Sequence, residues 1–213
     1  MLKIQKPTKQ EQNDFVLHLY FGFNEDPLDS CIKRAYLDMA RTLHGLAKHE
    51  NREILTPDAA KLLKLFLNDL VKIQTIKTQD EFDSWHHMIC NSLIMSYQVG
   101  GYMDFSYGQA QKWLNMTMKY IYVFGDDYFP DYTSVYNFCH MPLDNYILDA
   151  LYKKGAPKLG TSWSTTKKVN YLKIQNWIRD AYPEVAPLAV EFHLWNEAMK
   201  NSTKKLTKSE QES

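Results

Sequence analysis

Residues 104–116 read Asp-Phe-Ser-Tyr-Gly-Gln-Ala-Gln-Lys-Trp-Leu-Asn-Met and form the most informative stretch of the chain. A turn of small and polar residues leads here into a helix that we expect from about Gln109 to Val123. The N-terminus of a helix presents free backbone N–H groups, which favour an anion such as a phosphate. Lys112 lies near this helix start, and a lysine that has lost its proton is a nucleophile toward carbon. Taken alone, Lys112 is more simply interpreted as a solvated helix residue.

Helix-start signals recur through the rest of the sequence. Asp26-Pro27, Thr56-Pro57-Asp58 and the capping box at 78–81 each place a capping side chain before apolar residues spaced three and four apart. The first of these helices is expected to extend to about Leu46, and further helices are expected at 143–152, 166–181 and 185–200. No stretch alternates apolar and polar residues for long enough to require a strand. The sequence therefore predicts an all-α fold.

The composition is that of a globular protein, with 45% hydrophobic residues and only 8 glycines in 213 residues. A formal net charge of zero argues against a strongly basic nucleic-acid coat protein and against an acidic disordered protein. The charge is unevenly distributed, because residues 1–150 hold 14 Lys+Arg against 19 Asp+Glu, whereas residues 151–213 hold 11 against 6. A neutral total can therefore still present a basic face.

The domain organisation is expected to be simple. The length suits one domain over residues 1–200, followed by a disordered polar tail at 201–213. Neither an apolar leader nor a stretch long enough to span a bilayer is visible, so we expect a cytoplasmic protein without membrane contact. Three widely spaced cysteines indicate reduced thiols rather than a disulfide framework. We expect no metal, because the adjacent His86 and His87 diverge on a helix.

A second informative stretch is Pro142-Leu143-Asp144. Pro142 fixes the entry into a helix, and Asp144 is most simply the N-cap of that helix, since aspartate is a preferred capping residue. The alternative is that Asp144 carries chemistry together with Lys112. A carboxylate near a developing positive charge stabilises that charge electrostatically, and a neutral lysine is the matching nucleophile.

Together the two stretches resemble the helix-hairpin-helix superfamily of DNA glycosylases. The family's hairpin reads roughly Gly-x-Gly-x-Lys, which Gly108-Gln109-Ala110-Gln111-Lys112 matches except that alanine replaces the second glycine. Its catalytic aspartate follows in a Pro-x-Asp segment, like that of Asp144. The separation of 32 positions between Lys112 and Asp144 is most similar to the archaeal 8-oxoguanine branch. That branch also carries a carboxylate and a tryptophan one helical turn apart, as Glu191 and Trp195 are here.

The resemblance covers residues 104–195 and implies a complete set of roles. It implies two helical lobes around a cleft, and an enzyme that excises a damaged or modified base from double-stranded DNA by flipping it out of the stack. Lys112 is then the nucleophile of an AP-lyase reaction and Asp144 its assisting carboxylate, while Glu191 and Trp195 line the base pocket. The base is 8-oxoguanine or, alternatively, a hypermodified base of foreign DNA. We further expect a monomer that needs no cofactor.

The expected DNA contacts lie in two places. Backbone N–H groups of the hairpin are expected to hold a phosphate without reading sequence, at Gly108, Gln109, Ala110 and Gln111. Five lysines of the basic C-terminal part are expected to flank the cleft, so that binding weakens steeply with salt: Lys153, Lys154, Lys158, Lys167 and Lys168. Because alanine stands at position 110, an alternative stays open, namely a non-catalytic DNA-binding or protein-interaction module that retains only the hairpin.

Overall fold

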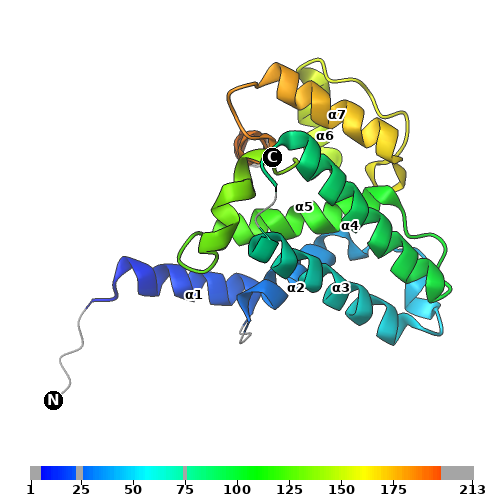
Figure 1. Cartoon of the computed structure of the whole chain (residues 1–213), viewed down its shortest axis with the longest axis horizontal. Helices are drawn as coiled ribbons and strands as arrows, with labels where there is room; N and C mark the ends of the chain where they lie inside the picture. The colour runs from blue at the N-terminus through cyan, green and yellow to red at the C-terminus, as the bar shows by residue number, and fades with distance from the viewer. Residues whose placement is uncertain (1–5, 23–25, 74–75, 198–213) are drawn as a thin grey trace, which may run out of the picture.

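The computed structural model describes residues 6–22, 26–73 and 76–197. Every regular element in these ranges is a helix, and none of them contains a strand, so the predicted all-α class is confirmed (Figure 1). Within the same ranges, no helix combines the length and the apolar character that crossing a membrane requires. The tail predicted to be disordered, 201–213, lies outside the described residues.

The helices follow one another with short connections. In chain order they are α1 (Lys9–Phe21), α2 (Pro27–Ala40), η1 (Leu46–Lys48), α3 (Arg52–Ile73), α4 (Gln79–Val99), α5 (Tyr107–Phe124), η2 (Pro130–Phe138), α6 (Asn145–Lys153), η3 (Trp163–Thr165) and α7 (Lys168–Ala181). A last helical segment covers residues 187–197. Figure 1 shows α5 in the middle of the molecule, with α2 and α3 below it and α6 and α7 above it.

Helix α5 is the centre of the fold. Every residue from Tyr107 to Ile121 is buried, including polar ones, because α2, α4, α7, η2 and η3 all pack against this helix. Trp113 is fully buried and donates its indole N–H to the carbonyl of Ile32 at 3.0 Å, which ties α5 to α2. Trp113 is therefore a core residue.

Capping chemistry sets the starts of the helices. The Asp26 side chain accepts from the Leu28 N–H, and Thr78 forms a reciprocal capping box with Glu81, as the sequence predicted. Helix α5 begins earlier than predicted, because Ser106 caps it and forms a capping box with Gln109. Lys112 consequently lies in the second turn of α5 rather than at its start.

Two predicted helix ends were wrong. Helix α2 ends at Ala40 rather than near Leu46, and the chain then turns through Gly45, whose φ of 82° suits glycine. Helix α3 begins at Arg52 rather than after Thr56, so Pro57 lies inside the helix near its N-terminal end. A proline there removes one backbone hydrogen bond, but hydrogen bonds from the N–H groups of residues 54 and 55 to the Asn51 carbonyl have already formed the first turn.

A buried polar network fixes α5 on its α4 and α7 side. Asn115 of α5 bonds to His86 Nε2 at 2.9 Å through its carbonyl and to the Tyr171 hydroxyl at 2.9 Å through its amide. His140 joins that hydroxyl at 2.7 Å to the Asp83 carboxylate at 2.6 Å. Burial lowers the pKa of both histidines below the ordinary value. The network holds the loop before α6, and therefore Asp144, in register with α5.

Candidate active site

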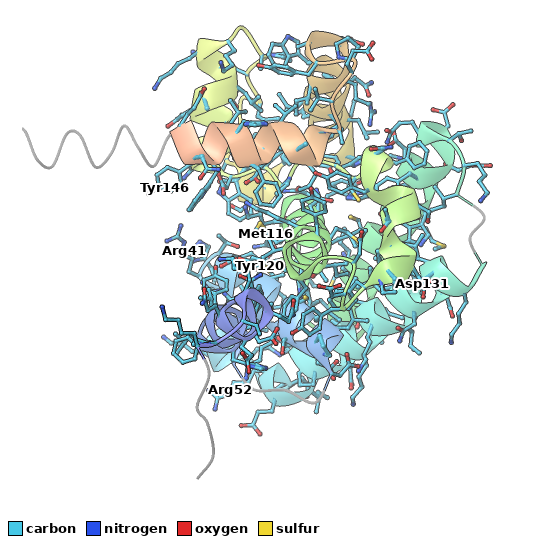
Figure 2. The ribbon with its side chains drawn as sticks, turned by 90° about the vertical axis from the view of Figure 1, so that its left-hand side faces the viewer. Arg41, Arg52, Met116, Tyr120, Asp131 and Tyr146 are labelled. Carbon is cyan, nitrogen blue, oxygen red and sulfur yellow. The ribbon has the colours of Figure 1, made fainter. Side chains whose placement is uncertain are left out.

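A cleft of about 840 Å³ opens on the other side of α5. Its floor is α5, one wall comes from α1 and α2, and the opposite wall comes from α6 and the helical segment 187–197. Figure 2 shows Arg41 and Tyr146 on the two sides of the opening, with Met116 and Tyr120 of α5 further into the molecule. The four residues that the sequence placed in the reaction centre and base pocket all line this one cleft: Lys112, Asp144, Glu191 and Trp195.

Lys112 and Asp144 form a largely buried ion pair. The Lys112 ammonium lies 2.8 Å from Asp144 Oδ2, and only 5% of the Lys112 side chain is exposed against 24% of the Asp144 side chain. The more exposed Asp144 therefore provides the route from the cleft to the pair. The prediction that these two residues, 32 positions apart, share one site agrees with this contact.

Asp144 serves as an N-cap at the same time. Its Oδ1 accepts the Ile147 N–H at 2.9 Å at the start of α6, while Oδ2 faces Lys112. Burial pushes the pKa of Asp144 upward, but the Lys112 ammonium and the Ile147 N–H outweigh burial, so the pKa lies below its ordinary value. The carboxylate is thus held ionised at the cleft. The capping interpretation of Asp144 is confirmed, and the same side chain pairs with Lys112 through its second oxygen.

A second buried ion pair lies further along α5. Lys119 donates to Glu191 Oε1 at 2.9 Å, and Oε2 lies 2.6 Å from the same nitrogen without hydrogen-bond geometry. Burial raises the pKa of Glu191, although the Lys119 charge acts in the opposite direction. The Asp144 charge also raises the pKa of Glu191, so the two pairs interact across the cleft.

Aromatic rings enclose the second pair. The Lys119 ammonium lies 4.8 Å from the centre of the Phe192 ring and 5.6 Å from that of Trp195, within the range of cation–π attraction. Trp195 is 42% exposed, so one part of its indole faces the cleft opening. Glu191 and Trp195 are one turn apart on the segment 187–197, as their spacing predicted.

The α2 wall of the cleft carries a third polar group. Asp38 accepts a short hydrogen bond from the Tyr120 hydroxyl and lies 3.6 Å from Arg34. Tyr20 of α1 joins this group at 3.2 Å from the Tyr120 hydroxyl, and the Arg34 guanidinium lies over the Tyr20 ring. These contacts attach the end of α1 to the body beside the cleft.

The four hairpin residues 108–111 are not at a surface. Gly108 packs so closely against η3 that an added Cβ would lie 2.0 Å from the Trp163 carbonyl oxygen. The Gln109 N–H is bonded to Ser106 Oγ, and Gln111 donates to the Gly108 carbonyl. The predicted phosphate contact by Gly108, Gln109, Ala110 and Gln111 therefore does not fit the structure, because η3 and the cap occupy the place a phosphate would need.

The five predicted DNA-binding lysines lie outside the cleft lining. Four of them are exposed and Lys168 is half-buried: Lys153, Lys154, Lys158, Lys167 and Lys168. The structure brings none of them to the Lys112–Asp144 pair. Lys168 begins α7, and its charge contributes to the lowered pKa of His87 on α4, so it faces the α4 side of the molecule.

Sequence reasoning missed Lys119, which stands beside Glu191. The signal was present, because Lys112 and Lys119 are seven positions apart and residues at that spacing share a helix face. Arg41 was also missed, since nothing in the local sequence places the end of α2 across from α6. Among the described residues, no group of three or more His, Cys, Asp or Glu side chains is placed to hold a metal ion.

We compared the chain with family models, with curated proteins and with solved structures, and none of the three comparisons finds a match.

Proposed function

We propose that this protein is a DNA glycosylase with AP-lyase activity, which excises a modified base from double-stranded DNA. The observation that carries the proposal is the Lys112–Asp144 pair of 2.8 Å, open to a cleft through Asp144. A cleft of about 840 Å³ falls in the range of roughly 300–1,000 Å³ typical of small-ligand sites, so it accommodates a flipped nucleotide. The cleft between α2 and α6 would separate the two helical lobes of such an enzyme.

The residue types fit the steps of the reaction. As the glycosidic bond breaks, its electron pair leaves with the base, which takes up a proton, and positive charge develops on the sugar. Asp144, held ionised, stabilises that charge. Lys112 gives up the proton that the departing base takes up, and the neutral amine then forms the bond from Nζ to C1′. The bound nitrogen then loses a proton, and O4′ takes up a proton as the C1′–O4′ bond breaks, which yields a protonated Schiff base. Loss of a C2′ proton drives β-elimination, in which the C3′–O bond breaks and the 3′ phosphate leaves.

The second pair supplies the proposed base pocket. Glu191 presents a buried carboxyl group beside the rings of Phe192 and Trp195. A flat base would stack on such rings, and the carboxyl group would bond to its polar edge. We propose 8-oxoguanine or a hypermodified base of foreign DNA as the target, and a cytoplasmic monomer without a cofactor as the acting form.

A borohydride trapping experiment on a panel of duplexes, each carrying one lesion or modified base, tests this proposal. We expect a covalent protein–DNA adduct for the wild-type protein on at least one duplex. Lys112→Met should abolish the adduct, whereas Lys72→Met, the same change at an exposed lysine of α3 outside the cleft lining, should retain it. An adduct that persists in Lys112→Met, or the lack of base release and of any adduct across the panel, would contradict the proposal.

One observation favours a second candidate, a non-catalytic helical module that binds DNA or another protein. Both buried lysines of the cleft are fully paired with carboxylates, which is also what a purely structural role requires. The double variant Lys112→Met/Asp144→Asn separates the two candidates. A module would bind DNA both as the wild-type protein and as the double variant, and would release no base in either. An enzyme would release the base as the wild-type protein and lose this activity in the double variant.

A further inference from the structure

The charges in the cleft are mostly neutralised within the protein. Lys112 is paired with Asp144 and Lys119 with Glu191, so neither lysine offers a free charge to an incoming phosphate. Of the three cations that line the cleft, Arg41 is the one whose side chain has no ionic or hydrogen-bonding partner among the described residues. Its guanidinium is exposed at the rim. A guanidinium binds a phosphate through two parallel N–H groups.

The backbone that carries Arg41 is held firmly. Arg41 is the C-cap of α2, and the next residue, Thr42, receives two hydrogen bonds from the Gln109 side chain of α5: 2.8 Å to its carbonyl and 3.2 Å to its hydroxyl. The Gln109 side chain therefore positions the end of α2 relative to the floor of the cleft. The Arg41 side chain is free to extend while its attachment point is fixed.

Tyr146 occupies the opposite rim. It follows Asp144 by two residues in the first turn of α6, so it is necessarily close to the proposed reaction centre. Tyr146 is 58% exposed as a residue, and its hydroxyl makes no hydrogen bond to the described residues. Figure 2 shows Tyr146 and Arg41 across the opening from each other. An exposed ring of this kind is a stacking surface for a nucleobase.

The rim charges give the strand an orientation. Asp149, an exposed residue of α6 that also lines the cleft, adds negative charge on the Tyr146 side. A phosphate is repelled from that side and attracted to Arg41, whereas an uncharged base tolerates the Tyr146 side.

We propose that Arg41 and Tyr146 clamp the DNA strand at the cleft mouth. Arg41 binds the phosphodiester next to the flipped nucleotide, and the Tyr146 ring stacks on the neighbouring base. This inference rests on the proposed function, since it names where the strand of that substrate lies. Both residues are positioning residues, because neither touches Lys112 or Asp144 through an ion pair or hydrogen bond.

Binding of a duplex with a stable tetrahydrofuran abasic-site analogue, measured over a series of salt concentrations, tests Arg41. Arg41→Ala should lower the slope of log affinity against log salt by about 0.9, the value for one lost phosphate contact. Arg52→Ala removes the same charge at a residue outside the cleft lining and should leave the slope at the wild-type value (Figure 2). An equal slope for Arg41→Ala and the wild-type protein would overturn the inference.

The same duplex tests Tyr146. Tyr146→Ala should weaken binding about 5- to 150-fold, the range for one lost base stack, while Tyr146→Phe keeps the ring and most of the affinity. Equal affinities for the alanine variant and the wild-type protein would overturn this half of the clamp. Failure of the proposed function itself looks different, because the wild-type protein would then give no trapped adduct on any duplex of the panel, whether or not it binds the abasic-site duplex.

Discussion

The two ion pairs on α5 each join a lysine to a carboxylate, but the pKa of the carboxylate is lowered in one pair and raised in the other. Lys112 and Lys119 share a helix face, and each meets a carboxylate within 3 Å. Asp144 is partly exposed, and the Lys112 charge together with the Ile147 N–H outweighs burial and keeps the pKa of Asp144 below the ordinary value. Glu191 is 2% exposed, and Lys119 is its one ionic partner among the described residues, so burial raises the pKa of Glu191. In the proposed enzyme, this difference would assign the stabilisation of positive charge to Asp144 and hydrogen bonding with the base to Glu191.

The most severe way to break the second pair is to remove one partner. Glu191→Ala leaves the Lys119 ammonium buried without a counter-charge, and we expect the free energy of unfolding to fall by about 3–5 kcal/mol. The double variant Lys119→Met/Glu191→Gln removes both charges and should recover most of that loss. Urea denaturation measures both values. If the single and double variants are equally destabilised, the pair is not the source of the loss.

The catalytic difference between the two carboxylates is the next largest effect. Asp144→Asn keeps a capping side chain but removes the charge, and we expect single-turnover base release to slow about 10²–10³-fold. Glu191→Gln keeps a hydrogen-bonding side chain in the base pocket and should slow the same step less. The rates are compared on the duplex that gives the strongest adduct. A larger effect for Glu191→Gln would reverse the assignment of the two roles.

The smallest expected effect is a pair of opposite slopes of stability against pH. The folded-state pKa of Glu191 is raised. Its contribution to the free energy of unfolding is therefore present below pH 4.5 and is lost as the pH rises through the folded-state pKa. The folded-state pKa of Asp144 is lowered, so its contribution is present above pH 3.8 and is lost as the pH falls through the folded pKa. Unfolding free energies of the wild-type protein, Asp144→Asn and Glu191→Gln across this range measure the slopes. Equal slopes of unfolding free energy against pH in all three proteins would show that folding does not shift the pKa of either carboxylate.

The sequence was sufficient wherever local chemistry sets the structure. Capping side chains at Asp26, Thr78 and Asp144 start the helices that they predicted, because an N-cap acts on its own first turn. Glu191 and Trp195 share a helical segment for the same reason, since their spacing fixes a common face. The all-α class followed from these local signals.

What the sequence could not provide depends on contacts between distant elements. The stretch 108–111 contains polar residues and was expected at a surface, but η3, more than 50 positions later, covers it. The apposition of Arg41 and Tyr146 depends on how α2 and α6 pack around α5. Excess positive charge after residue 150 predicted a basic face near the cleft, whereas the five named lysines lie outside its lining. A count of charges along the sequence does not tell on which side of the folded molecule the charged side chains lie.

The complete burial of α5 from Tyr107 to Ile121 has a consequence for how the molecule opens. Backbone amides at its core can reach solvent only when the surrounding helices separate, so they should exchange hydrogen for deuterium through global unfolding. Amides of the exposed helix α1, which has no buried residue, should exchange far sooner. We therefore expect Lys112, the proposed nucleophile, to stand on one of the slowest-exchanging helices among the described residues.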